Sequence, residues 1–283
     1  MMYKTAIITG ASSGFGLLTT VELARRGFHV LATMRNMQKS QTFQTMTEDS
    51  KILNRIHAFP LDVTNQDSIQ TFQHKVEQLE QVDVLVNNAG FAVGGFAEDV
   101  SLDAYRRQFE ANVFGVMAVT QVVLPKMRQQ GFGKVINVSS ISGKIAFPGL
   151  SPYVASKHAL EGYTESLRLE VKPFGVQVAL VEPGSYKTNI WSTGMEVAED
   201  SMKDDSAYQG YMEAIYSQLE TGKQKHGDAK EVAYLIADLS DRKHFRKLHY
   251  PIGKGVKVLL WIKQTLPWNR WEQLVLSKLG MKK

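Results

Sequence analysis

The sequence has 283 residues, a length that suits one large α/β domain. Hydrophobic residues make up 43%, charged residues 22%, and there is no cysteine, which excludes fibrous or wholly disordered architectures, disulfides and thiolate nucleophiles. The net charge of +5 is uneven: from Arg242 to the end, eleven Lys or Arg residues accompany one acid, Glu272, so the remainder is acidic and nucleic-acid binding is not expected.

Short apolar runs alternate with helical patterns between residues 5 and 181. The apolar runs predict buried strands at residues 5–8, 28–33, 56–61, 82–86, 134–138 and 176–181. Apolar residues at helical spacing predict helices at residues 17–26, 64–79, 102–130 and 151–172. This order predicts an α/β fold with a doubly wound parallel sheet, a Rossmann fold, in which ligands bind at the carboxyl ends of the strands.

The rest of the chain predicts one domain with two additions. We expect a single domain over residues 1–253, in which residues 191–227, rich in Ser, Glu, Asp and Tyr, form an insertion over the site. Residues 254–283 predict a basic helical extension. No run reaches the 18 or so apolar residues that cross a bilayer, and the N-terminus lacks the pattern of a signal peptide, so a cytoplasmic location is expected.

The extension holds three of the four tryptophans, Trp261, Trp268 and Trp271, among lysines and apolar residues. Two interpretations stay open. The segment packs on the protein as a lid or subunit contact, which we favour because apolar helical stripes are usually buried. Alternatively, it lies peripherally on an anionic membrane surface, where tryptophan and lysine are favoured.

The turn after the first strand carries three glycines, in the run Thr9-Gly10-Ala11-Ser12-Ser13-Gly14-Phe15-Gly16. Gly10 allows a tight turn, Gly14 a close approach of the backbone to a pyrophosphate, and Gly16 close packing of helix and strand. The amides of Ser12, Ser13 and Phe15 would face the anion at the helix start. An ordinary glycine-rich loop is the alternative, but the position between a strand and a helix favours dinucleotide binding.

The end of the second strand reads Thr33-Met34-Arg35-Asn36 and lacks the acid that usually binds the adenosine ribose of NAD. Arg35 instead offers a guanidinium where a 2′-phosphate would lie. A solvated surface arginine is the alternative. The pattern favours NADP as the cofactor.

Tyr153 and Lys157 are four residues apart, so they share one face of a predicted helix. A nearby ammonium favours the tyrosinate, which would make Tyr153 a general acid/base for an alcohol or carbonyl. Ser140, at the end of the fifth strand, could hydrogen-bond a substrate oxygen, and Asn112 could join a water-linked proton path. Each of these residues alone has an ordinary structural explanation.

Together these residues resemble the short-chain dehydrogenase/reductase family. TGASSGFG, LDV at 61–63, NNAG at 87–90, Asn112, Ser140, YVASK at 153–157, and Pro183-Gly184 with Thr188 occur in family order. VLATMRN and the closing YPIGKG resemble members that act on retinoids and hydroxysteroids. One departure is Ser13, where many NADP-dependent relatives have a basic residue, so the NADP preference would depend on Arg35.

The resemblance implies the catalytic tetrad Asn112, Ser140, Tyr153 and Lys157. It also implies that Asp62 and Val63 contact adenine, that Asn88, Ala89 and Gly90 lie along the adenosine side, and that Pro183, Gly184 and Thr188 contact the nicotinamide carboxamide. A homodimer or homotetramer is a further expectation from the family, and no metal site is expected.

The predicted function is therefore NADP-dependent interconversion of an alcohol and its carbonyl by hydride transfer, on an apolar retinoid-, steroid- or lipid-like small molecule. Two alternatives remain. One is an NAD(P)-binding redox sensor without turnover, and the other is an NAD-preferring dehydrogenase.

Overall fold

The computed structural model describes residues 3–188, 190, 194–203, 205–223 and 226–281. Parts of the insertion predicted at residues 191–227 (191–193, 204 and 224–225) lie outside the described residues.

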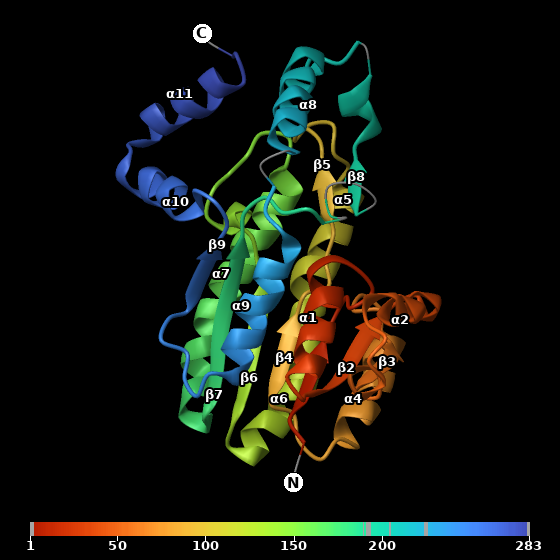
Figure 1. Ribbon diagram of the computed structural model, residues 1–283. Coiled ribbons are helices and arrows are strands. Elements are labelled where there is room, and N and C mark those ends of the chain that lie inside the picture. Colours follow the sequence, from red (N-terminus) through yellow and green to blue (C-terminus); the bar gives the residue numbers. More distant parts are fainter. Residues whose placement is uncertain (1–2, 189, 191–193, 204, 224–225, 282–283) are drawn as a thin grey trace.

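A seven-stranded parallel sheet runs through the described chain in the order β3-β2-β1-β4-β6-β7-β9 (Figure 1). Its strands are β1 Thr5–Ile8, β2 His29–Met34, β3 Ile56–Pro60, β4 Val84–Asn87, β6 Gly133–Val138, β7 Val176–Pro183 and β9 His249–Ile252. Strands β5 (Ala92–Gly94) and β8 (Met195–Val197) form a separate two-stranded sheet. All six predicted strands and the doubly wound parallel arrangement are confirmed.

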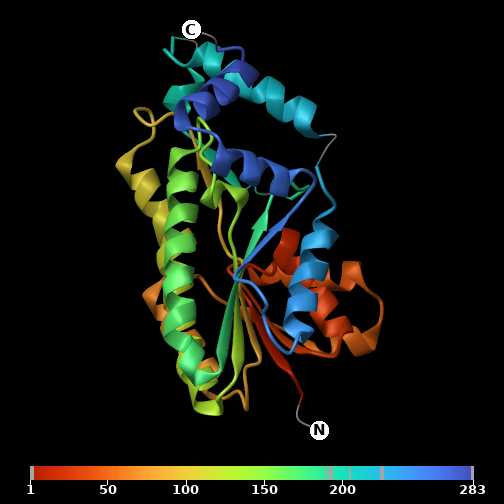
Figure 2. The same ribbon diagram turned by 90° about the vertical axis from the view of Figure 1, so that its left-hand side faces the viewer.

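Helices cover both faces of the large sheet, as Figure 2 shows edge-on. The α-helices of the described chain are α1 Gly14–Arg25, α2 Thr42–Met46, α3 Ser50–Leu53, α4 Gln66–Glu77, α5 Leu102–Phe109, α6 Gly115–Gln130, α7 Ser151–Val171, α8 Gln209–Lys223, α9 Ala229–Asp241, α10 Val256–Thr265 and α11 Trp268–Lys278. Helices α1 and α9 pack together on one face, while α4, α6 and α7 lie on the other.

Alternate side chains of each strand enter two separate cores. In β1, Ile8 packs with Val21 of α1 and Ile236 of α9, whereas Ile7 packs with Val119 of α6 on the opposite face. Because both faces are buried, the strands read as continuous apolar runs, which is why they were predictable.

The order of the sheet reverses between β1 and β4, since β1 connects outward to β2 and β3 while β4 leads to β6, β7 and β9. Such a reversal leaves a crevice at the carboxyl ends of the strands. The loops that follow β1, β2, β4, β6 and β7 meet there.

The structure differs from the sequence prediction in several elements. The helix predicted at 102–130 is divided into α5, a π-helical segment at Glu110–Phe114, and α6. No element was predicted for α2, α3, β5, β8, α8, α9 or β9. Strand β9 is half-buried and contains Pro251, which an edge strand tolerates because one side of its backbone makes no ladder.

The extension after residue 253 forms α10 and α11, close to α8 (Figure 2). Trp271 is only 3% exposed, and Gln218 of α8 donates a hydrogen bond to the carbonyl of Lys278. Trp261 and Trp268 are 64% and 61% exposed. None of the described helices has the length and apolar character needed to span a membrane.

Candidate active site

A cavity of about 850 Å³ lies at the carboxyl ends of the strands. It brings together the sequence-predicted site residues with one exception, Gly16. The predicted residues that line it are Gly10, Ser12, Ser13, Gly14, Phe15, Arg35, Asp62, Val63, Asn88, Ala89, Gly90, Asn112, Ser140, Tyr153, Lys157, Pro183, Gly184 and Thr188.

The glycine loop is built by contacts that leave no room for side chains. Gly10 has φ +66°, and a Cβ there would lie 2.8 Å from the Cα of Ala89. A Cβ on Gly16 would lie 2.3 Å from the carbonyl oxygen of Gly10, so Gly16 supports the loop from behind and does not line the cavity. The N-cap residue of α1, Ser13, makes no side-chain capping hydrogen bond, which leaves first-turn N–H groups to bind an anion.

Asn88 holds this loop against β4. Its Nδ2 donates to the carbonyl oxygens of Thr9 and Gly10 at 3.0 and 3.1 Å. Thr9 Oγ1 accepts from the backbone N–H groups of Asn88 and Ala89 at 2.9 and 3.0 Å. Thr9 was not among the predicted site residues, although its position directly before Gly10 in the glycine loop could have indicated its role.

The far end of the cavity, at the carboxyl end of β2, carries two exposed cations. Arg35 lines it as predicted, and Lys39, which the sequence analysis missed, lines it as well. Asp62 is turned to its own loop, where Oδ1 accepts from the N–H and hydroxyl of Thr64 at 3.0 and 2.7 Å. No acid competes with Arg35 at the end of β2, where the sequence continues as Asn36.

Helix α7 places Tyr153 and Lys157 at the inner end of the cavity, beside the loop that follows β6. Tyr153 is 3% exposed and shares a hydrogen bond with Ser140. Lys157 Nζ donates to the carbonyl of Val138 at 2.9 Å and lies 5.7 Å from the centre of the Tyr153 ring. Ser140 Oγ accepts from the N–H of Ser142 at 3.1 Å, which fixes its turn.

Burial governs the protonation of both groups. It raises the pKa of Tyr153 to about 12, against a smaller lowering by the Ser140 hydrogen bond. It lowers the pKa of Lys157 to about 8, against the charge of Glu161, which raises it. The expectation that Lys157 brings the tyrosine pKa toward neutrality is therefore not met in this arrangement, where the phenol is protonated at pH 7.

Asn112 sits in the π-helical segment, a distortion often found at functional sites. Its Oδ1 accepts from the N–H of Phe91 at 3.1 Å, and its Nδ2 donates to the Phe91 carbonyl at 3.0 Å and to Ser156 Oγ at 3.3 Å. The side chain thus ties the turn after β4 to α7. Its role in a water path stays a prediction.

Apolar and charged groups that the sequence analysis missed line the other wall. Phe91, Tyr186, Ile190 and Met195 face the cavity, and Arg107 of α5 pairs with Glu196 of β8 at its edge. Apart from Arg107, these residues lie in loops and short strands without periodicity, so they carry no local sequence signal.

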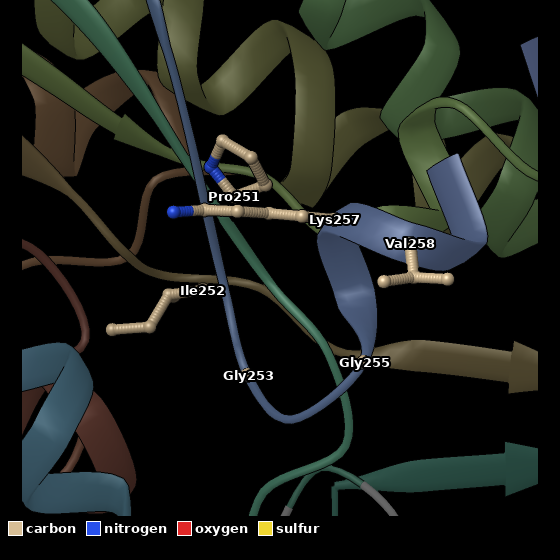
Figure 3. Close-up of a pocket in the computed structure, with 6 residues that line it drawn as sticks. All are labelled: Pro251, Ile252, Gly253, Gly255, Lys257 and Val258. Carbon is tan, nitrogen blue, oxygen red and sulfur yellow. The ribbon is translucent and has the colours of Figure 1, made fainter. Parts of the chain in front are cut away.

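The turn from β9 into α10 is connected to the cavity. The N–H of Gly184 donates to the carbonyl of Ile252 at 2.9 Å, and a Cβ on Gly184 would lie 2.6 Å from Val256 Cγ2. Figure 3 shows this turn, where Gly253 and Gly255 adopt φ +127° and +75° beside a small pocket of about 280 Å³.

Comparison with known proteins agrees with this geometry. A family model described as short chain dehydrogenase matches residues 4–200. The chain belongs to the short-chain dehydrogenase/reductase family. It is 50% identical over 279 residues, 99% of each chain, to the Bacillus subtilis protein named uncharacterized oxidoreductase YusZ.

Two solved structures share the fold. A short-chain dehydrogenase from Streptomyces avermitilis superposes with a TM-score of 0.81, at 32% identity, over 99% of this chain and 98% of that one. ElxO, solved with NADP bound, superposes with a TM-score of 0.74, at 25% identity, over 91% of this chain and 100% of that one. The protein is therefore an NAD(P)-dependent oxidoreductase of the short-chain dehydrogenase/reductase family.

Proposed function

We propose that this protein is an NADP(H)-dependent oxidoreductase that interconverts an apolar carbonyl compound and its alcohol. The observation that carries the proposal is the buried hydrogen bond between Tyr153 and Ser140, with Lys157 beside it, at the inner end of a cavity large enough for a dinucleotide and a substrate.

Several features of this chain suit the binding of a nicotinamide dinucleotide in the cavity. The glycine loop presents backbone where side chains would collide, and the N-terminus of α1 suits a pyrophosphate. Arg35 and Lys39 would hold a 2′-phosphate, which supports NADP over NAD. The NADP bound to ElxO supports the same preference.

The chain's own residues would move the proton. A bound nicotinamide supplies or accepts the hydride. In reduction, the Tyr153 hydroxyl donates its proton to the substrate oxygen while Ser140 hydrogen-bonds that oxygen; in oxidation, Tyr153 takes the proton back. Lys157 would stabilise the tyrosinate. Because burial keeps the phenol protonated, this arrangement is better prepared for carbonyl reduction.

An apolar substrate is supported by the lining of the cavity and its surroundings. Phe91, Ile190 and Met195 face it, and Phe96 of the neighbouring β5 region stacks on Tyr208 with ring centres 4.1 Å apart. The similarity to retinoid- and hydroxysteroid-type members points to the same class. We further propose that residues 254–283 serve as a cover over α8, in keeping with the burial of Trp271.

The test replaces the proposed acid. Tyr153→Phe removes one hydroxyl from a buried ring, so the variant should bind NADPH with wild-type affinity but lose roughly 10²–10⁴-fold in turnover, the contribution that general acid catalysis makes. Stopped-flow absorbance of the nicotinamide with a panel of hydrophobic ketones measures the hydride step. Tyr234→Phe, 47% exposed on α9 and outside the cavity, is the matched control.

Comparable turnover in Tyr153→Phe would remove this residue from the mechanism. If wild-type protein binds NADPH but oxidises none of it with any ketone, the redox-sensor alternative gains over an enzyme. Tighter binding of NADH than NADPH would favour the NAD-preferring alternative.

A further inference from the structure

A group of titratable side chains lies behind Lys157, beyond the residues that line the cavity. Glu161 of α7, Glu182 of β7 and His249 of β9 place carboxylate and imidazole atoms within 4.8 Å of one another. Both glutamates are buried, whereas His249 is partly exposed. Three elements of the fold thus converge on one polar cluster that extends from two buried carboxyl groups to the surface.

Contacts within this cluster are short. His249 Nδ1 lies 2.7 Å from Glu182 Oε1 and 3.4 Å from Glu161 Oε2. Lys144 Nζ lies 3.0 Å from Glu161 Oε2, so a lysine supplies the positive charge that a metal ion would bring. Glu165, at the surface, lies 3.7 Å from both Lys144 Nζ and His249 Nε2, and Arg168 adds a further charge near His249.

The two buried carboxyl groups cannot both be ionised comfortably. Lys144 Nζ contacts one oxygen of Glu161, Oε2, and Glu182 faces the same carboxyl group. Two carboxylates are both acceptors, so a proton on one of them turns the contact into a hydrogen bond. Burial, followed by the charge of Glu161, raises the pKa of Glu182 to about 8, so Glu182 carries the proton at neutral pH.

Glu161 connects this cluster to the proposed catalytic groups in two ways. It follows Lys157 by four residues, so both buried side chains occupy one face of α7. It also packs under the turn that carries Ser140: a Cβ on Gly143 would lie 2.8 Å from Glu161 Cγ, 2.9 Å from its Oε1 and 3.0 Å from Ser139 Oγ.

We propose that Glu161 is a positioning residue, whose buried carboxylate holds Lys157 in the ammonium form while Glu182, Lys144 and His249 hold Glu161 in place. The inference rests on the proposed function, because it assigns Lys157 its importance. Glu161 touches neither substrate nor cofactor and acts through the lysine. Its charge raises the pKa of Lys157, against the lowering that burial causes.

The direct test follows the charge of Lys157 without any turnover. Protein labelled with 13C-lysine is titrated between pH 5 and 10, and the Lys157 Cε resonance is assigned by its loss in Lys157→Met. Glu161→Gln keeps the shape and removes the charge, so we expect the Lys157 midpoint to fall by at least one pH unit. Glu170→Gln makes the same charge change on the exposed face of α7 and should leave the midpoint unchanged.

An unchanged midpoint in Glu161→Gln overturns the inference, as does an equal shift in Glu170→Gln. If circular dichroism shows that Glu161→Gln does not fold, the wild-type midpoint decides. A value near 8 supports the carboxylate's role, whereas a midpoint below about 6 means that Lys157 is neutral at pH 7 despite Glu161 and refutes it.

Activity gives a second readout. If the Lys157 midpoint falls by one unit from about 8, the ammonium fraction drops about fivefold at pH 8 and hardly at all at pH 6. Turnover of Glu161→Gln should therefore match wild type at pH 6 and fall at least about fivefold below it at pH 8. Equal loss at both pH values would indicate a merely structural residue. If the Lys157 midpoint shifts in Glu161→Gln but the wild-type protein shows no turnover, only the proposed function is contradicted.

Discussion

Tyr153 and Lys157 stand one helical turn apart in the same buried environment, yet desolvation moves their pKa values in opposite directions. Burial disfavours the charged form of each, so the phenol keeps its proton and the ammonium loses its proton more readily. The pair therefore depends on other charges nearby to reach its working state. Glu161 is one such charge that the chain itself provides.

The proposed preference for NADPH depends on two exposed residues, Arg35 and Lys39. Arg35→Asp removes a guanidinium and places a carboxylate beside the proposed 2′-phosphate, so we expect NADPH affinity to fall about 10- to 100-fold while NADH binding holds or improves. Lys39→Gln should cost less, since an ammonium makes a weaker, single-point contact with phosphate. Fluorescence titration with each cofactor measures both constants.

Lys51→Gln is a suitable comparison for these variants, because Lys51 is an exposed lysine on α3 that does not line the cavity. It should leave both affinities unaltered. An NADPH/NADH ratio that stays the same in Arg35→Asp would show that the 2′-phosphate binds elsewhere.

Residues at a fixed spacing within one sequence motif were predictable, whereas residues that come together only in the folded structure were not. Tyr153, Lys157 and the glycine loop are local in sequence, so helix geometry and backbone freedom reveal them. Glu161 lies four residues after Lys157 in α7, but its partners Glu182 and His249 come from two strands, β7 and β9. Only folding brings the three together.

At the scale of elements, the two glycines inside α1 and α7 have opposite surroundings. A Cβ on Gly16 would lie 2.3 Å from the Gly10 carbonyl, whereas nothing lies within 4 Å of one on Gly162. Gly16→Ala should therefore destabilise the fold by about 1–3 kcal/mol and weaken cofactor binding. Gly162→Ala should stabilise it by up to about 1 kcal/mol, because alanine is the better helix former.

Urea denaturation of both variants, with and without NADPH, gives these values. Similar free energies of unfolding for Gly16→Ala and Gly162→Ala would contradict the tight approach of α1 to the loop.

The elements that sequence patterns predicted are those with a strong period. Buried strands such as β1 and β6 are apolar throughout, and α4 shows a clear stripe. The π-helical segment carries no separate pattern, since its residues continue the apolar spacing of α5 and α6. Strand β9 was missed because its four half-buried residues include a proline and show neither alternation nor an apolar run.

For the whole molecule, Glu182 links stability to pH. Its pKa rises from 4.5 to about 8 on folding, so the folded state holds a proton that the unfolded state has lost between these values. The free energy of unfolding should therefore fall as pH rises, by at most about 1.4 kcal/mol per pH unit. We choose pH 6.5 to 8, where Glu182 dominates. His249, whose pKa burial lowers below 6.5, is at most half protonated in the unfolded state in this interval and opposes the trend only weakly.

Urea denaturation at pH 6.5 and pH 8 measures the slope. Glu182→Gln has no titrating group at position 182, so its free energy of unfolding should depend less on pH. A wild-type protein that gains stability over this interval would refute the assignment of the proton to Glu182.

Strand β9 pairs with β7 at the edge of the sheet, although it lies more than sixty residues further along the chain. Helices α8 and α9 come between the two strands in the sequence. During synthesis, the outer edge of β7 has no partner strand until residues 249–252 leave the ribosome. An unpaired apolar edge is a template for intermolecular association. Chains that stop short of residue 252 would thus tend to associate with one another through the free edge of β7.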